Sequence, residues 1–246
     1  MINAGRHFQV ARYKQTGSIS YYNSKTVIMK VIVTGTTGMV GEGVLEECLR
    51  NPLVTEVVSF ARKPFGKSHP KLKEVIHGDF FNIHPVAEEL KGYDACFFCL
   101  GVTSLGKGEE EYTRATYTLT MHVAEVLSGQ NPAMTFCYVS GGGTDSTEKG
   151  RLMWARVKGK TENDLMKLPF RQVFAFRPGF LRADKGARHV LKGYKYVDWI
   201  YPIGRMLLKN GFCTLAELGK AMIAITEKGY FKKTIEVRDI VALAEA

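Results

Sequence analysis

Two residues in the stretch LMWARVKGK, Trp154 and Lys158, are spaced for chemistry at a common site. In a helix, residues four apart lie one turn apart on the same face, so both side chains would reach the same pocket. A lysine there could tune a neighbouring acid, but the neighbour is an indole, whose N–H donates a hydrogen bond and does not titrate in water. The pair therefore leaves open which group, if any, moves a proton.

A second chemical motif is the glycine-rich stretch VIVTGTTGMVGEGVLEE, which joins a predicted strand to a predicted helix. In such a junction Gly35 allows a tight turn, Gly38 lets the backbone approach a pyrophosphate, and Gly41 permits close packing of the helix. The helix N-terminus adds a positive field that favours phosphate. The junction therefore predicts a dinucleotide-binding loop.

The end of the second predicted strand should choose between NAD and NADP. A site selective for NAD places a carboxylate there for the ribose hydroxyls, but this sequence has SFARKPFGK, with Arg62 and Lys63 and no acid. A guanidinium can hold a 2′-phosphate with forked hydrogen bonds. NADP is therefore the predicted cofactor rather than NAD, with an ordinary loop cation as the alternative role of Arg62.

Short apolar runs alternate with helical patterns from Met29 onward. Strands are predicted at 29–35, 55–61, 73–79, 94–101, 133–143, 170–179 and 232–240, and helices at 41–51, 109–129, 150–168 and 214–229. Strands that lack polar alternation and are separated by helices indicate a parallel sheet covered on both faces. The predicted fold class is a doubly wound α/β sheet in a single domain, residues 29–246.

Two segments fall outside this regular pattern. Residues 1–28 are predicted to be a poorly ordered extension, with Met29 as the true start or a targeting arm as the alternative. Residues 180–211 are predicted to form a small C-terminal substrate or lid region. The basic, aromatic part of that region, 189–210, could also contact a membrane surface, but Pro202 and Gly204 interrupt a helical period, which favours a lid or a homodimer contact.

Composition and charge restrict the possible functions. The 246 residues are 45% hydrophobic and 24% charged, without an apolar run of membrane-spanning length or a secretory signal, which predicts a cytoplasmic protein. The net charge of +10 is concentrated in residues 150–211, which carry 14 basic and 4 acidic residues. Such a region suits a phosphorylated ligand or a solvated basic face, and the absence of a recognisable module predicts that nucleic acid is not a partner.

Metal, redox and hydrolase chemistry are not predicted. The odd number of cysteines indicates reduced thiols, and Cys96 and Cys99 lie three apart in an apolar strand, where they would point to opposite faces. The six histidines lack metal-ligand spacing, and none neighbours Ser140 in a nucleophile elbow.

Several motifs occur in one order along the chain. They are TGxxGxxG ending at Gly41, HGD ending at Asp79, FFCLGVT at 97–103, Ser140, Lys158 and RPG at 177–179. Together they resemble the short-chain dehydrogenase/reductase superfamily in its atypical NAD(P)-dependent epimerase/dehydratase-like form. FFCLGVT, the long following helix and VKGKTEN before FRPG look like its Tat-interacting-protein oxidoreductase branch. The resemblance covers roughly residues 29–240 and implies a Rossmann fold.

The resemblance also implies a set of cofactor-binding residues. Phosphates would lie at Gly35, Thr36, Thr37, Gly38, Met39 and Val40, the adenine near Asp79 and Phe80, and the adenosine ribose at Leu100, Gly101 and Val102. Lys158 would hold the nicotinamide ribose, and Pro178, Gly179 and Phe180 would meet the carboxamide. Taken alone, Asp79 and Ser140 could equally be a turn acceptor and a strand-end cap.

The departure from the family pattern is Trp154. The family uses Tyr-x-x-x-Lys, in which the tyrosine moves the substrate proton and a serine, here Ser140, polarises the carbonyl. Proton transfer could instead use Ser140, a water, Tyr112 or Tyr117, or the substrate could need little acid assistance. The expected function is an NADP-binding reductase of a small carbonyl compound, with Ser140, Lys158 and Trp154 at the reacting centre. The alternative is a non-catalytic, NADPH-dependent sensor or regulator of a partner protein.

Overall fold

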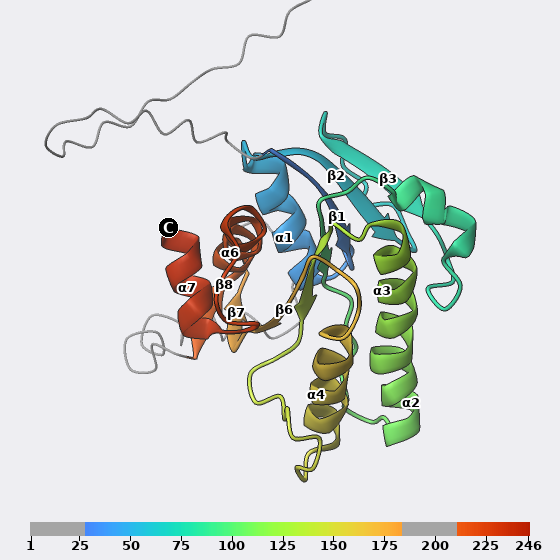
Figure 1. The fold of residues 1–246 in the computed structure, drawn as a ribbon, viewed down its shortest axis with the longest axis vertical. Helices are drawn as coiled ribbons and strands as arrows, with labels where there is room; N and C mark the ends of the chain where they lie inside the picture. The colour runs from blue at the N-terminus through green and yellow to red at the C-terminus, as the bar shows by residue number, and fades with distance from the viewer. Residues whose placement is uncertain (1–27, 184–210) are drawn as a thin grey trace, which may run out of the picture.

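The computed structural model describes residues 28–183 and 211–246, in which a seven-stranded sheet is covered by helices on both faces (Figure 1). Its strands are β1 (Met29–Thr34), β2 (Val54–Ala61), β3 (Leu72–Ile76), β4 (Ala95–Phe98), β5 (Thr135–Val139), β6 (Gln172–Arg177) and β9 (Thr234–Glu236). The strand order is β3-β2-β1-β4-β5-β6-β9, and every neighbouring pair is parallel. The predicted doubly wound α/β fold is confirmed.

The helices divide between the two faces of the sheet. They are α1 (Met39–Arg50), α2 (Glu109–Thr113), α3 (Leu119–Gln130), α4 (Met153–Leu165), α6 (Leu215–Lys228) and α7 (Val237–Glu245), with the 3₁₀ helix η1 (His84–Leu90) and the π-helical turn η2 (Arg114–Thr118). α1, α6 and α7 lie on one face, and α3 and α4 lie on the other (Figure 1). The continuous helix predicted over 109–129 is interrupted by η2, which joins α2 to α3.

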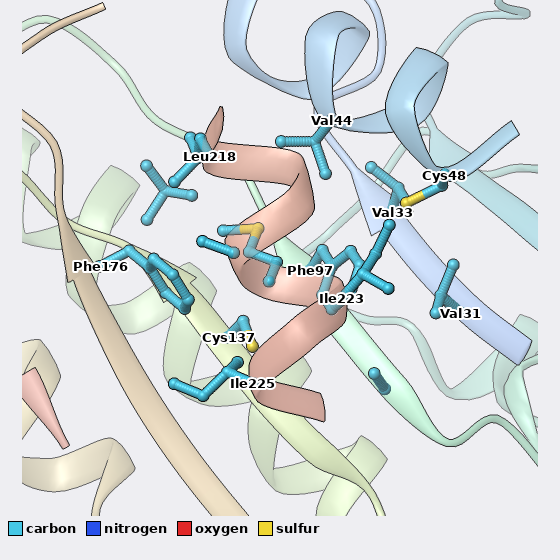
Figure 2. Packing of buried hydrophobic residues seen from close by; sticks show 14 of the residues in the cluster. Val31, Val33, Val44, Cys48, Phe97, Cys137, Phe176, Leu218, Ile223 and Ile225 are labelled. Carbon is cyan, nitrogen blue, oxygen red and sulfur yellow. The ribbon is translucent and has the colours of Figure 1, made fainter. Parts of the chain in front are cut away.

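Successive residues of the central strands enter two separate hydrophobic cores. Val31 and Val33 of β1 pack with Val44 of α1 and Ile223 of α6 in the first core (Figure 2). Ile32, between the two valines, packs in the second core under α3 and η1. Because both faces are buried, the strands show no polar alternation, which explains the continuous apolar runs in the sequence.

The cysteines follow the same division. Cys96 is buried in the second core, whereas Cys99 packs against the first, so their side chains point to opposite faces as predicted. All five cysteines are free thiols. In residues 28–183 and 211–246, no group of three or more His, Cys, Asp or Glu side chains could hold a metal ion.

The last part of the chain differs from the prediction. The strand predicted over 232–240 is limited to β9, and α7 begins at Val237. Helix formation is favoured because Glu236 and Asp239 form a reciprocal capping box, and because Val237, Ile240 and Leu243 then fall on one buried face. Over so few residues the sequence period of a strand and that of a helix are difficult to distinguish.

A small parallel sheet also forms where the sequence pattern is irregular. It pairs β7 (Phe180–Arg182) with β8 (Phe212–Thr214). Apart from residue 28, the predicted N-terminal extension lies outside the described residues, and so does most of the predicted lid, residues 184–210. None of the helices in the described ranges combines the length and apolarity that crossing a membrane requires.

Helix α4, which carries Trp154 and Lys158, is held against the loop that follows β5 by a close backbone contact. A Cβ atom on Gly159 would lie 1.8 Å from the carbonyl oxygen of Asp145. The amide of Asp145 donates to the carbonyl of Ala155, 3.1 Å away, so the loop and the helix are also hydrogen-bonded. Glycine at position 159 is therefore required for α4 to pack in this place.

We expect Gly159→Ala to lower the free energy of unfolding by about 1–3 kcal/mol, because the added methyl group overpacks this contact. Gly129→Ala is the matched control, since a Cβ on that exposed glycine of α3 meets no atom within 4 Å. Alanine there should raise the free energy of unfolding by roughly 0.5–1 kcal/mol. Urea denaturation of both variants measures the difference, and equal stabilities would contradict the packing of the loop on α4.

Candidate functional site

The loops that follow β1, β4, β5 and β6 meet at the carboxyl edge of the sheet, where chain order reverses between β1 and β4. Open α/β sheets bind ligands at such a reversal. The β1 and β4 loops are in direct contact, because the amide of Cys99 donates to Thr34 Oγ1 at 3.0 Å. The candidate site is therefore built on adjoining strands rather than on one mobile loop.

Two of the three glycines in the β1 loop are required by the fold. Gly35 has φ +69°, and a Cβ there would lie 2.9 Å from the carbonyl oxygen of Cys99. A Cβ on Gly41 would lie 2.2 Å from the carbonyl oxygen of Gly35, so this glycine lets α1 pack against the turn. Their predicted roles, tight turn and close helix packing, are the ones that the structure displays.

Gly38 differs from these two glycines. Its backbone, φ −113° and ψ 162°, is extended and open to any residue, and a Cβ there would have Gly35 O, at 3.4 Å, as its nearest contact in the described chain. The residue is exposed and begins α1 without a side-chain cap. The fold therefore does not demand glycine at this position, whereas a ligand lying against the loop would.

The other residues predicted at this loop have distinct environments. Thr36 is buried, and its hydroxyl is 2.7 Å from that of Ser59 on β2, which ties the loop to the second strand. Thr37 is exposed beside Gly38. Met39 and Val40 are half-buried, with side chains packed against the first core. The exposed surface of the loop is thus formed by Thr37, Gly38 and the first amides of α1.

Arg62 and Lys63 follow β2 directly and are exposed. Neither forms an ion pair with another side chain in residues 28–183 or 211–246. The next cation along this loop, Lys67, is paired with Glu46 at 2.5 Å. Two unneutralised cations therefore lie at the same edge of the sheet as the glycine loop.

Asp79 and Phe80 follow β3 at this edge. Asp79 is exposed, and its Oδ1 accepts a hydrogen bond from the amide of Phe81 at 2.9 Å, so the carboxylate closes a turn. The ring of Phe80 is buried and stacks on Phe60 with 4.4 Å between ring centres. The Phe80 side chain thus supports the core, and only Asp79 presents a polar side chain.

The loop after β4 is largely exposed at the carboxyl edge of the sheet. Leu100 is half-buried, and Gly101 and Val102 are exposed. A Cβ on Gly101 would meet no atom within 4 Å, so its small size is not demanded by packing. Packing does not demand a small residue at Gly38 either, and the two glycines lie on neighbouring loops.

Ser140 and Lys158 meet at the end of β5. Lys158 Nζ donates to the carbonyl oxygen of Ser140 at 3.0 Å and lies 5.7 Å from the ring centre of Tyr138. The half-buried position of Lys158 removes water from the ammonium and lowers its pKa to about 8, although the negative charge of Glu162 opposes this change. Ser140 and Lys158, which were expected at one reacting centre, are therefore in direct contact in the structure.

The Ser140 hydroxyl belongs to a short hydrogen-bond chain. It is 2.9 Å from Thr144 Oγ1, which donates its single hydrogen to the carbonyl of Gly141 at 2.8 Å. Ser140 is therefore the donor to Thr144. Sequence reasoning missed Thr144, and the only local signal was a threonine four residues after the strand-end serine.

Trp154 packs against the glycine-rich turn that follows Ser140. A Cβ on Gly143, which has φ +85°, would be 3.5 Å from Cη2 of the indole. The indole is half-buried, one helical turn before Lys158. It therefore covers the backbone beside the candidate site, and its N–H cannot act as an acid.

The two tyrosines considered as substitute acids are engaged elsewhere. Tyr117 donates its hydroxyl hydrogen to Asp164 Oδ2 at 2.8 Å, and burial together with this carboxylate raises its pKa. Tyr112 is 2% exposed, and burial raises its pKa as well. Neither phenol is presented as a proton donor to a ligand.

An ion pair that sequence reasoning did not identify holds α4 to β6. Arg177 donates from Nε to Glu162 Oε1 at 3.0 Å and from Nη2 to Glu162 Oε2 at 2.5 Å, and Nη2 also contacts Ser146 Oγ. Glu162 lies one turn after Lys158 and is buried. The pair therefore fixes the helix that presents Lys158. The available signal was a glutamate four residues after the lysine, together with the RPG motif.

The segment after β6 packs beside the β5 loop at the carboxyl edge of the sheet. The amide of Gly142 donates to the carbonyl of Pro178 at 2.8 Å, which joins the β5 and β6 loops. Phe180 is 60% exposed and stacks on Phe212 with 5.2 Å between ring centres. A Cβ on Gly179 would lie 2.3 Å from the carbonyl of Gly211. Pro178 and Gly179 thus lie against Gly142, two residues after Ser140, and Phe180 exposes an apolar ring next to them in the chain.

Comparison with known proteins is consistent with this arrangement. The NAD dependent epimerase/dehydratase family matches residues 31–147. Protein HTATIP2 of Rattus norvegicus is 27% identical over 157 residues, 63% of this chain and 64% of that protein, so the match spans slightly less than two thirds of the relative. Protein FMP52, mitochondrial, of Meyerozyma guilliermondii is 28% identical over 165 residues, 65% of this chain and 68% of that protein. The cytoplasmic location of this chain stays a prediction.

Solved structures show the same fold. ADP-L-glycero-D-manno-heptose-6-epimerase of Helicobacter pylori superposes with a TM-score of 0.62 at 16% identity, covering 92% of this chain and 85% of that one. The Bordetella bronchiseptica enzyme WbmF in complex with NAD+ gives a TM-score of 0.60 at 15% identity, covering 90% and 78%. Residues 31–147, which contain the glycine-rich loop and strands β2 to β5 with most of β1, thus match the NAD dependent epimerase/dehydratase family, and the chain shares the fold of these solved structures over most of its length.

Proposed function

We propose that this chain binds NADP along the carboxyl edge of the sheet and reduces a small carbonyl compound. The observation that carries the proposal is Gly38, a glycine that the fold does not require, at the exposed start of α1. A diphosphate lying against this position would explain the absence of a side chain. It would also accept hydrogen bonds from the first amides of α1, which have no side-chain cap.

The residues around the loop fit the rest of a dinucleotide. Arg62 and Lys63, which form no ion pair within the described residues, provide cations where an adenosine 2′-phosphate would be recognised, and the sequence SFARKPFGK has no carboxylate at the place that NAD selection requires. The small exposed Gly101 leaves room for a ribose beside β4. Lys158 has two ammonium hydrogens left after its bond to Ser140 and can donate one of them to a ribose hydroxyl.

Reduction is the chemistry that this arrangement supports. When bound, the reduced dinucleotide would supply a hydride to the carbonyl carbon of the substrate. Ser140 would orient the carbonyl oxygen by turning its hydroxyl from Thr144, and Trp154 would cover the glycine turn and exclude water from it. Phe180 offers an exposed ring to the apolar part of a small substrate.

A second function is favoured by Trp154 itself. The indole occupies the position from which the family presents a phenolic acid, and it cannot replace that acid. In this alternative the protein binds NADPH without turnover and acts as a sensor or regulator of a partner protein. The indole of Trp154 would then pack beside the nicotinamide and take no part in proton transfer.

Gly38→Ala tests the dinucleotide site. Because the added Cβ has room in the protein but not beside a diphosphate, we expect at least a tenfold loss of NADPH affinity in calorimetric titration. The free energy of unfolding should fall by no more than about 1 kcal/mol, the scale of a helix N-cap change. Gly41→Ala is the contrasting variant, since its Cβ would collide with the carbonyl of Gly35 and destabilise the fold. Unchanged NADPH affinity in folded Gly38→Ala protein would refute the site.

Arg62→Ala tests the choice of cofactor. Loss of a charge-assisted contact to the 2′-phosphate should weaken NADPH binding by roughly 10–100-fold, from about 1.5–3 kcal/mol, and leave NADH binding unchanged. Lys67→Ala removes another cation of the same loop, one already paired with Glu46, and should change neither affinity. Calorimetric titration with both dinucleotides gives the ratio. If Arg62→Ala leaves the ratio of the two affinities as it was, NADP selection does not depend on this residue.

NADPH oxidation in the presence of aldehydes and ketones separates the two functions. For the reductase, we expect Ser140→Ala to lower kcat by about 100-fold, near the lower end of the range for positioned proton-transfer groups, with unchanged NADPH affinity. The backbone carbonyl that holds Lys158 is kept in this variant, and Thr144→Ser, which retains the supporting hydroxyl, is the control. Tight NADPH binding without oxidation by any compound in the panel would favour the regulator.

A further inference from the structure

Among the titratable side chains considered as proton donors in the described part of the candidate site, Lys158 keeps hydrogens that are not donated to a partner in the described chain. Its ammonium carries three hydrogens, and the carbonyl of Ser140 accepts one of them. The Ser140 hydroxyl hydrogen goes to Thr144, and the Tyr117 hydroxyl hydrogen goes to Asp164. The indole of Trp154 does not titrate, and Tyr112 is buried.

We infer that Lys158 is itself the general acid of the proposed reduction, replacing the phenol that Trp154 cannot supply. This inference rests on the proposed function and names the proton donor of the same site. Its geometric basis is the bond from Nζ to the backbone carbonyl of Ser140, the residue whose hydroxyl is expected to orient the substrate oxygen. It extends the role of Lys158 beyond holding ribose hydroxyls.

The step balances with the groups named. The carbonyl carbon of the substrate accepts the hydride that a reduced nicotinamide dinucleotide supplies, and the π electrons of its C=O bond move to the oxygen. That oxygen takes a proton from Lys158 Nζ, which breaks one N–H bond, forms one O–H bond and leaves a neutral amine. The product is an alcohol, and solvent water returns a proton to the amine before the next turnover.

The surroundings of Lys158 suit an acid at neutral pH. In the described chain, no carboxylate forms a salt bridge with Nζ. The groups that act on Lys158 or pack against it are Glu162 from α4 and Tyr138 from β5. Tyr112 of α2 acts on Tyr138, and Arg177 from β6 is paired with Glu162. Arg177 holds both oxygens of Glu162, so removal of water outweighs the attraction of this carboxylate and the pKa of Lys158 is lowered to about 8. Since a lysine with a lowered pKa loses its proton as the pH rises through that value, the acid is present below pH 8 and absent above it.

Lys158→Arg distinguishes proton donation from a positive charge that only holds ribose. Arginine keeps the charge and several donors, but it does not lose a proton in the working pH range of a protein. We expect this variant to bind NADPH within about threefold of the native affinity and to lose at least 100-fold in kcat, as removal of a positioned acid does. Lys158→Met should lose both binding and turnover. Lys160→Arg, the adjacent exposed lysine paired with Asp164, should leave both unchanged.

A second measurement does not depend on turnover. Acetylation of the cofactor-free protein at a series of pH values, followed by mass spectrometry, reports when each lysine becomes a free amine. We expect the half-reaction point of Lys158 near pH 8, well below that of Lys160, whose bond to Asp164 raises its pKa. The kcat of the native protein should fall with rising pH through the same midpoint.

Three results would overturn the inference. A Lys158→Arg variant that keeps native kcat shows that a positive charge is sufficient. A kcat that stays constant through the acetylation midpoint of Lys158 shows that its proton is not used, although the proposed function then stands. Failure of the native protein to bind either dinucleotide removes the proposed function and the inference together.

Discussion

Because all seven strands of the main sheet are parallel, every connection has to cross a face of the sheet, and every strand ends at the same edge. The residues of the candidate site are therefore brought together by the topology from distant parts of the chain. The Gly35 turn touches Cys99, Lys158 bonds to Ser140, and Gly142 bonds to Pro178, although these residues belong to four separate βα units. Burial on both faces holds the strands in register, so the edge is a rigid platform for a ligand.

Glycine serves two different purposes on this platform. Gly35, Gly41 and Gly159 let backbones approach more closely than a Cβ allows, and so they position α1 and α4. Gly38 and Gly101 are exposed at the same edge, and a Cβ on either would meet at most Gly35 O, at 3.4 Å from Gly38. The first group is required by the packing of the protein, whereas the packing of the described residues does not require the second. A glycine-rich sequence can therefore contain glycines that the fold requires and glycines that a ligand would require. The contacts that a Cβ would make in the structure distinguish the two kinds.

The parts of this protein that could be predicted are those encoded by local patterns. The strands, the main helices and the glycine loop follow from apolar runs, helical periodicity and a strand-to-helix junction. Thr144, Glu162 and Arg177 could not be identified because their roles depend on partners that only the fold brings within hydrogen-bond distance. Helix α7 was mistaken for strand because a few alternating residues satisfy both periods. Phe80 was expected near the adenine, but its ring is buried in the core against Phe60. The sequence does not reveal this contact because Phe60 lies on another strand.

Because Trp154 packs against Gly143, its intrinsic fluorescence depends on what surrounds the turn that follows Ser140. The chain has two tryptophans, and the other, Trp199, lies outside the described residues. The emission of an indole changes in wavelength and intensity with the polarity of its surroundings, and Trp154 is half-exposed over the turn that carries Ser140. An occupant arriving beside that turn would displace water from the ring. Binding of a ligand beside Trp154 could therefore be followed by indole fluorescence, without any attached dye.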